Sequence, residues 1–188
     1  MKYYLVLASI LFLSAQGLAQ KKYFTLGGGY VFAGIENSSH GTTGWRLNGT
    51  LEFPSPHGMT MHGVDLGYIH TSTEITEMSG GQPVLSKYTI TTWPLYYAPK
   101  FMIGKNKVQG YIKPVFGMQF SSLKRTGTLE TATSSDAGLF AGIGGGGMYN
   151  FTGDLFLYLE YEWAYQSNSY YNDGFVNSVM IGVGKSMK

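Results

Sequence analysis

The chain has 188 residues, no cysteine and a formal charge of +2, and only 13% of its residues are charged. These figures exclude a disulfide-stapled domain, thiol chemistry and cysteine-ligated metals, and they give no electrostatic basis for nucleic-acid binding. Glycine (27 residues) and tyrosine (15 residues) are abundant, whereas the charged fraction falls well below the ~25% of ordinary globular chains. Because no apolar run after residue 20 is long enough for a membrane helix, the composition favours a membrane protein built of strands.

The N-terminus has the layout of a secretory signal peptide. Lys2 supplies a positive charge, residues 3–13 form an apolar run, and small residues follow up to Ala19. The run is shorter than the ~20 residues that a helix needs to cross a bilayer, so an N-terminal anchor is the less favoured alternative. We therefore expect cleavage after Ala19, which removes residues 1–19 and leaves residues 20–188 as one exported domain.

Alternation of apolar and polar residues with a period of two then recurs along the chain. In residues 45–53 the odd positions are apolar, apart from Gly49, and the even positions are polar. The same alternation marks residues 108–120, 155–165 and 175–185 as strands. Weaker alternation predicts four more, at residues 23–35, 60–70, 87–102 and 137–149. Most of the eight strands reach the ~9–11 residues that a tilted strand needs to cross a bilayer.

The connections between these strands alternate in length. Residues 54–58, 104–107 and 150–154 are short turns rich in Pro, Gly, Asn and Asp, whereas residues 36–44, 71–86, 124–136 and 166–174 are longer polar loops. Short turns at one end and long loops at the other are typical of outer-membrane barrels. Pro94 and Pro114 fall inside predicted strands, where each removes a ladder donor, so we expect bulges there.

Strands with one apolar and one polar face predict an all-β fold, namely an eight-stranded antiparallel up-and-down transmembrane β-barrel. Lipid requires a sheet without free edges, and eight strands leave room inside only for side chains. Inward charges must then pair, since an uncompensated buried charge costs several kcal/mol. The charges predicted to form this polar plug are Arg46, Glu52, Asp65, Lys113, Glu160 and Glu162, with Arg46 and Lys113 pairing with the carboxylates. A polar channel or proton path is the alternative.

Four strand segments give the chain a resemblance to the OmpX/OmpA-like family of small outer-membrane barrels. They are residues 92–97 (TWPLYY), 111–117 (YIKPVFG), 141–147 (AGIGGGG) and 159–162 (LEYE). The resemblance covers nearly all of the exported chain and implies a barrel in the outer membrane of a Gram-negative cell. It says little about function, because the loops of such barrels differ in what they do. Residues 184–188 depart from the family pattern, which usually ends on an aromatic residue.

The catalytic and cofactor motifs in the sequence are each better explained by structure. The G-x-G-x-x-G pattern in residues 142–147 precedes a turn and not the helix that a dinucleotide site needs. His62 and His70 share a strand face but stand roughly 26 Å apart. Ser167 faintly resembles the serine of lipid A deacylases, but Tyr165 occupies the histidine position, so no base stands beside it. We expect no catalytic residue, no cofactor and no metal.

The favoured function is non-enzymatic: a structural role in the envelope, or binding and adhesion at the cell surface through the long loops. Tyr170 and Tyr171 are the candidate recognition residues, because aromatic side chains supply a large contact area at small entropic cost. An outer aromatic girdle is an equally supported role for them. The expected partners are outer-membrane lipid and surface or host ligands, with the protein a monomer. The rival functions are a lipid-modifying membrane enzyme and a soluble lipocalin-like binder, which would need an apolar interior.

Overall fold

The computed structural model describes residues 22–35, 41–56, 59–79, 82–104, 107–127, 131–152, 154–167 and 170–187. The expected signal peptide, residues 1–19, lies outside these ranges. The described residues form nine strands: β1 (Lys22–Ile35), β2 (Gly41–Pro54), β3 (Thr60–Ser79), β4 (Gln82–Tyr97), β5 (Lys100–Ile103), β6 (Val108–Thr126), β7 (Thr131–Thr152), β8 (Leu155–Gln166) and β9 (Tyr171–Met187). No helix formed by residues in these ranges is long and apolar enough to cross a membrane.

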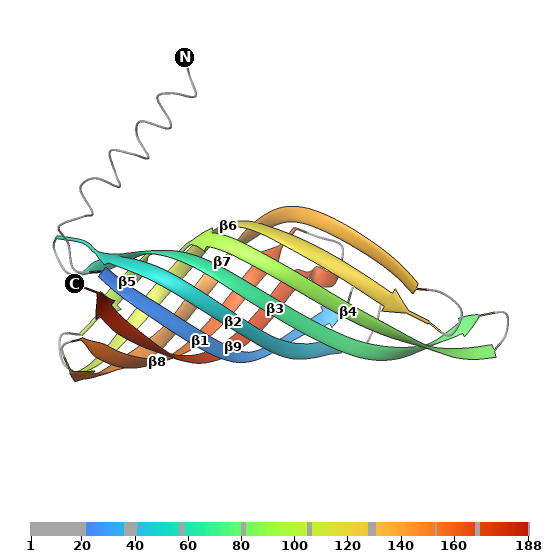
Figure 1. Ribbon diagram of the computed structural model, residues 1–188, viewed down its shortest axis with the longest axis horizontal. Helices are drawn as coiled ribbons and strands as arrows, with labels where there is room; N and C mark the ends of the chain where they lie inside the picture. Colours follow the sequence, from blue (N-terminus) through green and yellow to red (C-terminus); the bar gives the residue numbers. More distant parts are fainter. Residues whose placement is uncertain are drawn as a thin grey trace, which may run out of the picture.

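All of these strands belong to one antiparallel sheet that closes on itself (Figure 1). β1 pairs with β2 on one side and with β9 on the other, so the first and last strands complete the ring. β5 pairs with β3 and β6, the same neighbours as β4, and therefore continues the fourth strand of the ring. The eight-stranded antiparallel barrel predicted from the sequence is confirmed, with its fourth strand divided in two.

Proline explains the division but does not produce the expected bulges. Pro99 lies between β4 and β5 and has no N–H to give to the ladder. The register runs without a shift past Pro94 and Pro114, whereas the shifts fall at Ala33/Ile35 and Asn150/Thr152. The prediction of bulges at the two prolines is therefore wrong. Beside Pro94 the opposite strand has Gly67, where an added Cβ would lie only 2.9 Å from the proline Cγ, so the small residue makes room for the ring.

The strands differ greatly in length at one end of the barrel. We call the end with Lys22 and Met187 the near end and the opposite end the far end (Figure 1). At the far end β3 and β4 stay paired up to Ser79 and Gln82, and β6 and β7 up to Thr126 and Thr131. The pairing of β2 with β3 stops at Thr43 and Ser72, and that of β7 with β8 at Phe140 and Gln166. Residues 73–79, 82–91, 121–126 and 131–138 thus form a four-stranded protruding sheet.

The protruding sheet corrects two predicted loops. Most of residues 71–86 and 124–136 are strand and not loop. These segments were expected to be loops because they are polar. A strand needs an apolar outward face only within the lipid, so a polar segment beyond the lipid can still be a strand. β-branched residues such as Thr71, Thr73 and Ile75 favour the extended backbone regardless of polarity.

The predicted alternation of faces holds within the ring. In β8 the even positions from Phe156 to Gln166 are buried, and the odd positions are half-buried or exposed. Outward side chains such as Leu47 and Ile181 are apolar and 54% and 61% exposed. A lipocalin-like barrel has the reverse arrangement, so that rival is wrong.

The interior is layered along the barrel axis. An apolar and aromatic cluster of Met148, Phe156 and Tyr158 lies toward the near end. A second apolar cluster, which includes Val31, Ile69, Phe140 and Val176, lies toward the far end. Most of the charged side chains lie between these two layers, which we call the near and far clusters, and Lys100 and Glu52 lie beside the near cluster.

Candidate functional site: the charged interior

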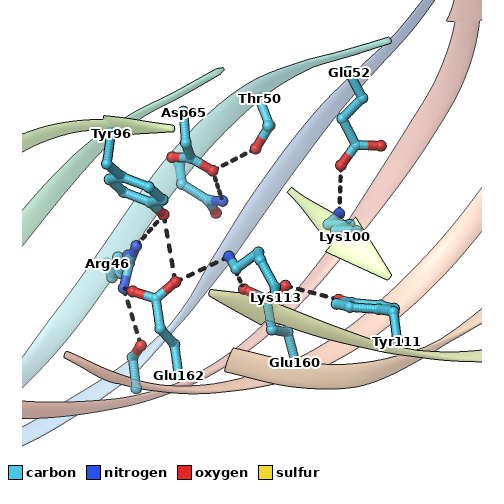
Figure 2. A network of polar contacts seen from close by, with 12 residues as sticks. Arg46, Thr50, Glu52, Asp65, Tyr96, Lys100, Tyr111, Lys113, Glu160 and Glu162 are labelled. Atoms are coloured by element: carbon cyan, nitrogen blue, oxygen red, sulfur yellow. Dashed lines mark hydrogen bonds and ion pairs between the residues drawn. The ribbon is translucent and has the colours of Figure 1, made fainter. Parts of the chain in front are cut away.

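A network of charged and hydroxyl-bearing side chains fills the middle of the barrel (Figure 2). Its members occupy inward positions of the strand alternation and come from opposite sides of the ring. Each is at most 3% exposed: Arg46 and Glu52 on β2, Asp65 on β3, Tyr96 on β4, Lys100 on β5, Tyr111 and Lys113 on β6, and Glu160 and Glu162 on β8. The six charges predicted to form the plug therefore all lie inside.

Arg46 uses both ends of its guanidinium. Its Nη1 donates to Glu162 Oε1 at 2.6 Å and to Ser178 Oγ at 3.1 Å, and its Nη2 donates to the Tyr96 hydroxyl at 2.5 Å. The guanidinium carbon also lies 5.8 Å from the centre of the Tyr96 ring and 5.9 Å from that of Phe140. Arg46 thus links β2, β4, β8 and β9, and its planar fork suits the simultaneous contacts.

Lys113 joins the two carboxylates of β8. Its Nζ lies 2.5 Å from Glu160 Oε1 and 2.9 Å from Glu162 Oε2. The Tyr111 hydroxyl donates to the second oxygen of Glu160 at 2.8 Å. Gly144 stands opposite Lys113, and an added Cβ there would lie 3.2 Å from Lys113 Cε. Glu162 is therefore shared by two cations, Arg46 and Lys113.

Glu52 pairs with Lys100, a residue that was not predicted to belong to the plug. The Lys100 Nζ also lies 4.9 Å from the centre of the Tyr111 ring and 5.3 Å from that of Tyr158. The inward phase of β4 falls on even positions and continues across Pro99 to Lys100. Extending that phase past the proline would have placed Lys100 inside.

Asp65 differs from the other carboxylates because neutral groups hold it. Its Oδ2 accepts hydrogen bonds from Asn48 Nδ2 at 3.1 Å and from the Thr50 hydroxyl. Within the described residues, neither Arg46 nor Lys113 makes an ion pair with Asp65 or Glu52. The expected pairing of those two cations with these two carboxylates is therefore wrong.

Tyr170 and Tyr171 lie inside the barrel and not on an exposed loop. They are 6% and 1% exposed and belong to the far cluster. The Tyr171 hydroxyl lies 3.2 Å from Thr71 Oγ1, and the Tyr170 hydroxyl donates to Ser134 Oγ at 3.1 Å.

An irregular start to β9 accounts for this orientation. Asp173 and Gly174 have φ angles of 53° and 71°, and the register with β1 shifts nearby. We therefore correct the expectation of an exposed aromatic pair, because this irregularity breaks the simple alternation and both rings turn inward.

The residues considered for catalysis and metal binding are dispersed. Ser167 Oγ accepts a hydrogen bond from the Leu139 amide at 2.6 Å, and Tyr165 packs outward with its ring centre 5.5 Å from that of Phe175. His62 Nδ1 lies 2.5 Å from the Tyr97 hydroxyl, and His70 stacks on Tyr68, both on the outer wall. Among the described residues, no three or more His, Cys, Asp or Glu side chains are placed to hold a metal ion together.

Comparison with known proteins places this barrel in a family. Residues 5–184 match the family model described as the outer membrane protein beta-barrel domain. No curated protein matches the sequence. The resemblance to small outer-membrane barrels inferred from the strand segments is thereby confirmed.

Three solved structures illustrate the shared fold. Neisserial surface protein A superposes with a TM-score of 0.64 at 12% identity, covering 88% of this chain and 97% of that one. A major outer membrane protein of Thermus thermophilus gives 0.62 at 14% identity, covering 89% and 99%. Ail, the attachment invasion locus protein of Yersinia pestis, gives 0.55 at 18% identity, covering 89% and 99%. The chain belongs to the outer membrane protein beta-barrel domain family.

Proposed function

We propose that the protein is a non-enzymatic surface barrel that binds other molecules through its protruding sheet. The observation that carries this proposal is the unequal length of the strands: β3, β4, β6 and β7 continue past the ends of their neighbours (Figure 1). In outer-membrane barrels the short turns face the periplasm and the longer connections face outward. The protruding sheet then stands at the cell surface, beyond the lipid.

The edge of the protruding sheet suits an extended partner. Residues 131–137 of β7 pair with β6, and the pairing of β7 with β8 begins only at Phe140. All seven of these residues are exposed, and they contain no proline and a single charge, Asp136. An open edge of this kind offers backbone groups to which a partner can add a strand.

The filled interior supports binding over conduction. The near and far clusters and the charged network together fill the lumen, and the cations and carboxylates of the network are ion-paired or hydrogen-bonded. A barrel of eight strands has an interior just wide enough for side chains. The interior therefore fits a plug that holds the wall together better than it fits a path for ions.

The surroundings of Ser167 support a non-enzymatic role. Its hydroxyl oxygen is engaged by the Leu139 amide, and in the described part of the chain no histidine forms a hydrogen bond with it. A serine nucleophile needs a base within hydrogen-bond reach. The Ail structure in complex with the heparin analogue sucrose octasulfate gives a precedent for ligand binding by a barrel of this fold.

Shortening the hairpins tests the proposal. Replacing residues 124–133 by Asn-Gly connects Leu123 to Ser134, and replacing residues 76–85 by Asn-Gly connects Ile75 to Ser86; both are existing register pairs. Cells that display each variant are assayed for binding to immobilised extracellular-matrix extract and to sucrose octasulfate. We expect the β6–β7 variant to lose binding and the β3–β4 variant to retain most of it, with heat-modifiable gel mobility unchanged in both. Equal binding by cells that display the full chain and by cells that lack it would refute the surface-binding role.

A proline scan of residues 132–137 tests edge pairing more directly. In an antiparallel pair the N–H groups of alternate residues point to the partner strand and to the open edge. Proline at an edge-facing position removes an N–H that only the partner strand would use. Binding should therefore fall at alternate positions while folding persists. A loss without that periodicity would indicate recognition by side chains.

A further inference from the structure

An apolar groove of about 800 Å³ crosses the outer wall of the barrel from β4 to β9. Two rows of outward side chains border it, each following register partners from strand to strand: Tyr68, Leu47, Gly28 and Ile181 on one side, and Leu66, Gly49, Leu26 and Val183 on the other. Gly28 and Gly49 supply no side chain at positions where their neighbours carry leucine. The missing side chains leave the wall hollow.

The groove slopes along the barrel because the strands are tilted. One row of partners runs from Ala137 on the protruding sheet through Phe120 to Trp93, whose ring centre is 4.6 Å from that of Tyr68. From Tyr68 it continues through Leu47, Gly28, Ile181 and Leu159, and it returns to β7 at Gly147. Gly147 lies toward the near end, so the row descends from the far end into the lipid-facing wall.

A second hollow of about 560 Å³ adjoins the groove at Trp93, which lines both. Trp93 and Phe120 form its aromatic sill, and the hydroxyls of Thr91, Ser122 and Ser135 form a row of register partners above the sill. We call this hollow the hydroxyl shelf. Ring faces next to hydroxyls are groups that can contact the faces and the hydroxyls of a sugar.

A cation stands just beyond the hydroxyl shelf. Lys124 is exposed and lies two residues past Ser122 on β6, on the same outward face, roughly 7 Å farther along the strand. Its register partners Thr89 and Thr133 are small and leave the ammonium accessible. An ammonium at this place can pair with a phosphate group of a ligand that lies on the hydroxyl shelf.

We propose that this face of the barrel binds a glycolipid of the outer leaflet. The acyl chain lies in the groove, and the phosphorylated sugar headgroup lies on the hydroxyl shelf beside Lys124. The hydroxyl shelf is the more polar of the two hollows, they share Trp93, and they follow one another down the wall, in the same order as the headgroup and acyl chain of such a lipid. A phospholipid would fill the groove alone and leave the shelf without a sugar partner.

Two substitutions separate the two parts of the site. Gly49→Leu fills the groove, and it is sterically tolerable because an added Cβ would lie 3.5 Å from Leu26 Cδ2, an ordinary contact. Gly147→Leu is the matched control, an outward glycine of β7 whose added Cβ would come no closer than 3.8 Å to another atom. Lys124→Glu removes the cation at the shelf, and Lys107→Glu, at an exposed position at the near end, controls for the change of charge.

Native mass spectrometry of the folded protein, mixed with equal amounts of lipid A and phosphatidylethanolamine, measures which lipid is retained. We expect the wild type to retain lipid A preferentially. Gly49→Leu and Lys124→Glu should lower that retention by about tenfold, equivalent to ~1.4 kcal/mol, while the two controls behave as wild type. Equal retention of both lipids by the wild type, or no difference between Gly49→Leu and Gly147→Leu, would overturn the proposal. Heat-modifiable mobility identifies folded protein, and Gly49→Val replaces Gly49→Leu if the larger residue prevents folding.

Discussion

Arg46 and Glu162 are 116 positions apart in the chain, yet Arg46 Nη1 and Glu162 Oε1 meet at 2.6 Å inside the barrel. The two residues belong to β2 and β8, which are not neighbours in the sheet. Their ion pair therefore spans the lumen and braces the wall from inside. Because water is excluded around both groups, removing one partner leaves a charge that the interior must accommodate.

Arg46→Met should destabilise the barrel by about 3 kcal/mol, at the lower end of the range for breaking a buried pair. The loss is limited because Glu162 keeps Lys113 at 2.9 Å. Urea titration in phospholipid vesicles, followed by tryptophan fluorescence, measures the free energy of unfolding. Arg46→Lys keeps the charge and should lose less, so equal losses for the two variants would contradict the ion-pair explanation.

The Lys100–Glu52 pair should show strong coupling in a double-mutant cycle. Each charge has the other as its ion-pair partner within the described residues, so Lys100→Met or Glu52→Leu alone should cost ~3–5 kcal/mol. The double variant leaves no isolated charge. Its loss in free energy of unfolding should therefore be far smaller than the sum of the two single losses. Additive losses would show that the two side chains stabilise the barrel independently.

Tyr171 should act through packing and not through surface recognition. Tyr171→Phe loses only the hydroxyl contacts with Thr71 and Thr92 and should cost ~1 kcal/mol, whereas Tyr171→Ser empties a site in the far cluster and should cost ~3–5 kcal/mol. The temperature at which the folded gel band disappears ranks the two variants. If Tyr171→Phe keeps wild-type stability but loses cell binding, the hydroxyl acts in recognition and the packing explanation is contradicted.

The wild-type barrel should show little steady conductance in planar bilayers. Ions would have to pass both the near and far clusters and the paired charges between them. Phe140→Ala, which opens the far cluster beside Arg46, should raise conductance only slightly, because the near cluster remains in place. Large persistent single-channel steps in the wild type would contradict the filled interior.

Much of the membrane-spanning ring could be predicted from the sequence because lipid forces one face of each strand to be apolar. That constraint produced the clear alternation of β2 and β8 and placed Arg46, Glu160 and Glu162 on one face. Beyond the lipid the constraint disappears, so the polar far-end segments of β3, β4, β6 and β7 resembled loops.

The remaining differences have local causes. Lys100 was missed because the alternation in residues 87–102 is weak, although the inward phase continues past Pro99. Tyr171 was misplaced because the backbone at Asp173 and Gly174 departs from extended geometry. Partner choice inside the lumen, such as Glu52 with Lys100, depends on strand stagger that no single strand reveals.

The closure of β1 against β9 also sets the order in which the protein can assemble. The contact of Arg46 on β2 with Glu162 on β8 reaches across the lumen, and the lumen is enclosed only when the first and last strands meet. Lys113 can meet the β8 carboxylates earlier, over Gly144 of the intervening strand β7. Arg46 lacks Glu162 until the seam closes, and an unpaired charge inside a partly formed sheet in lipid costs several kcal/mol. The step that seals the seam between β1 and β9 therefore also forms the Arg46–Glu162 brace, and a chain interrupted before β9 should be less stable in the membrane by the loss of both.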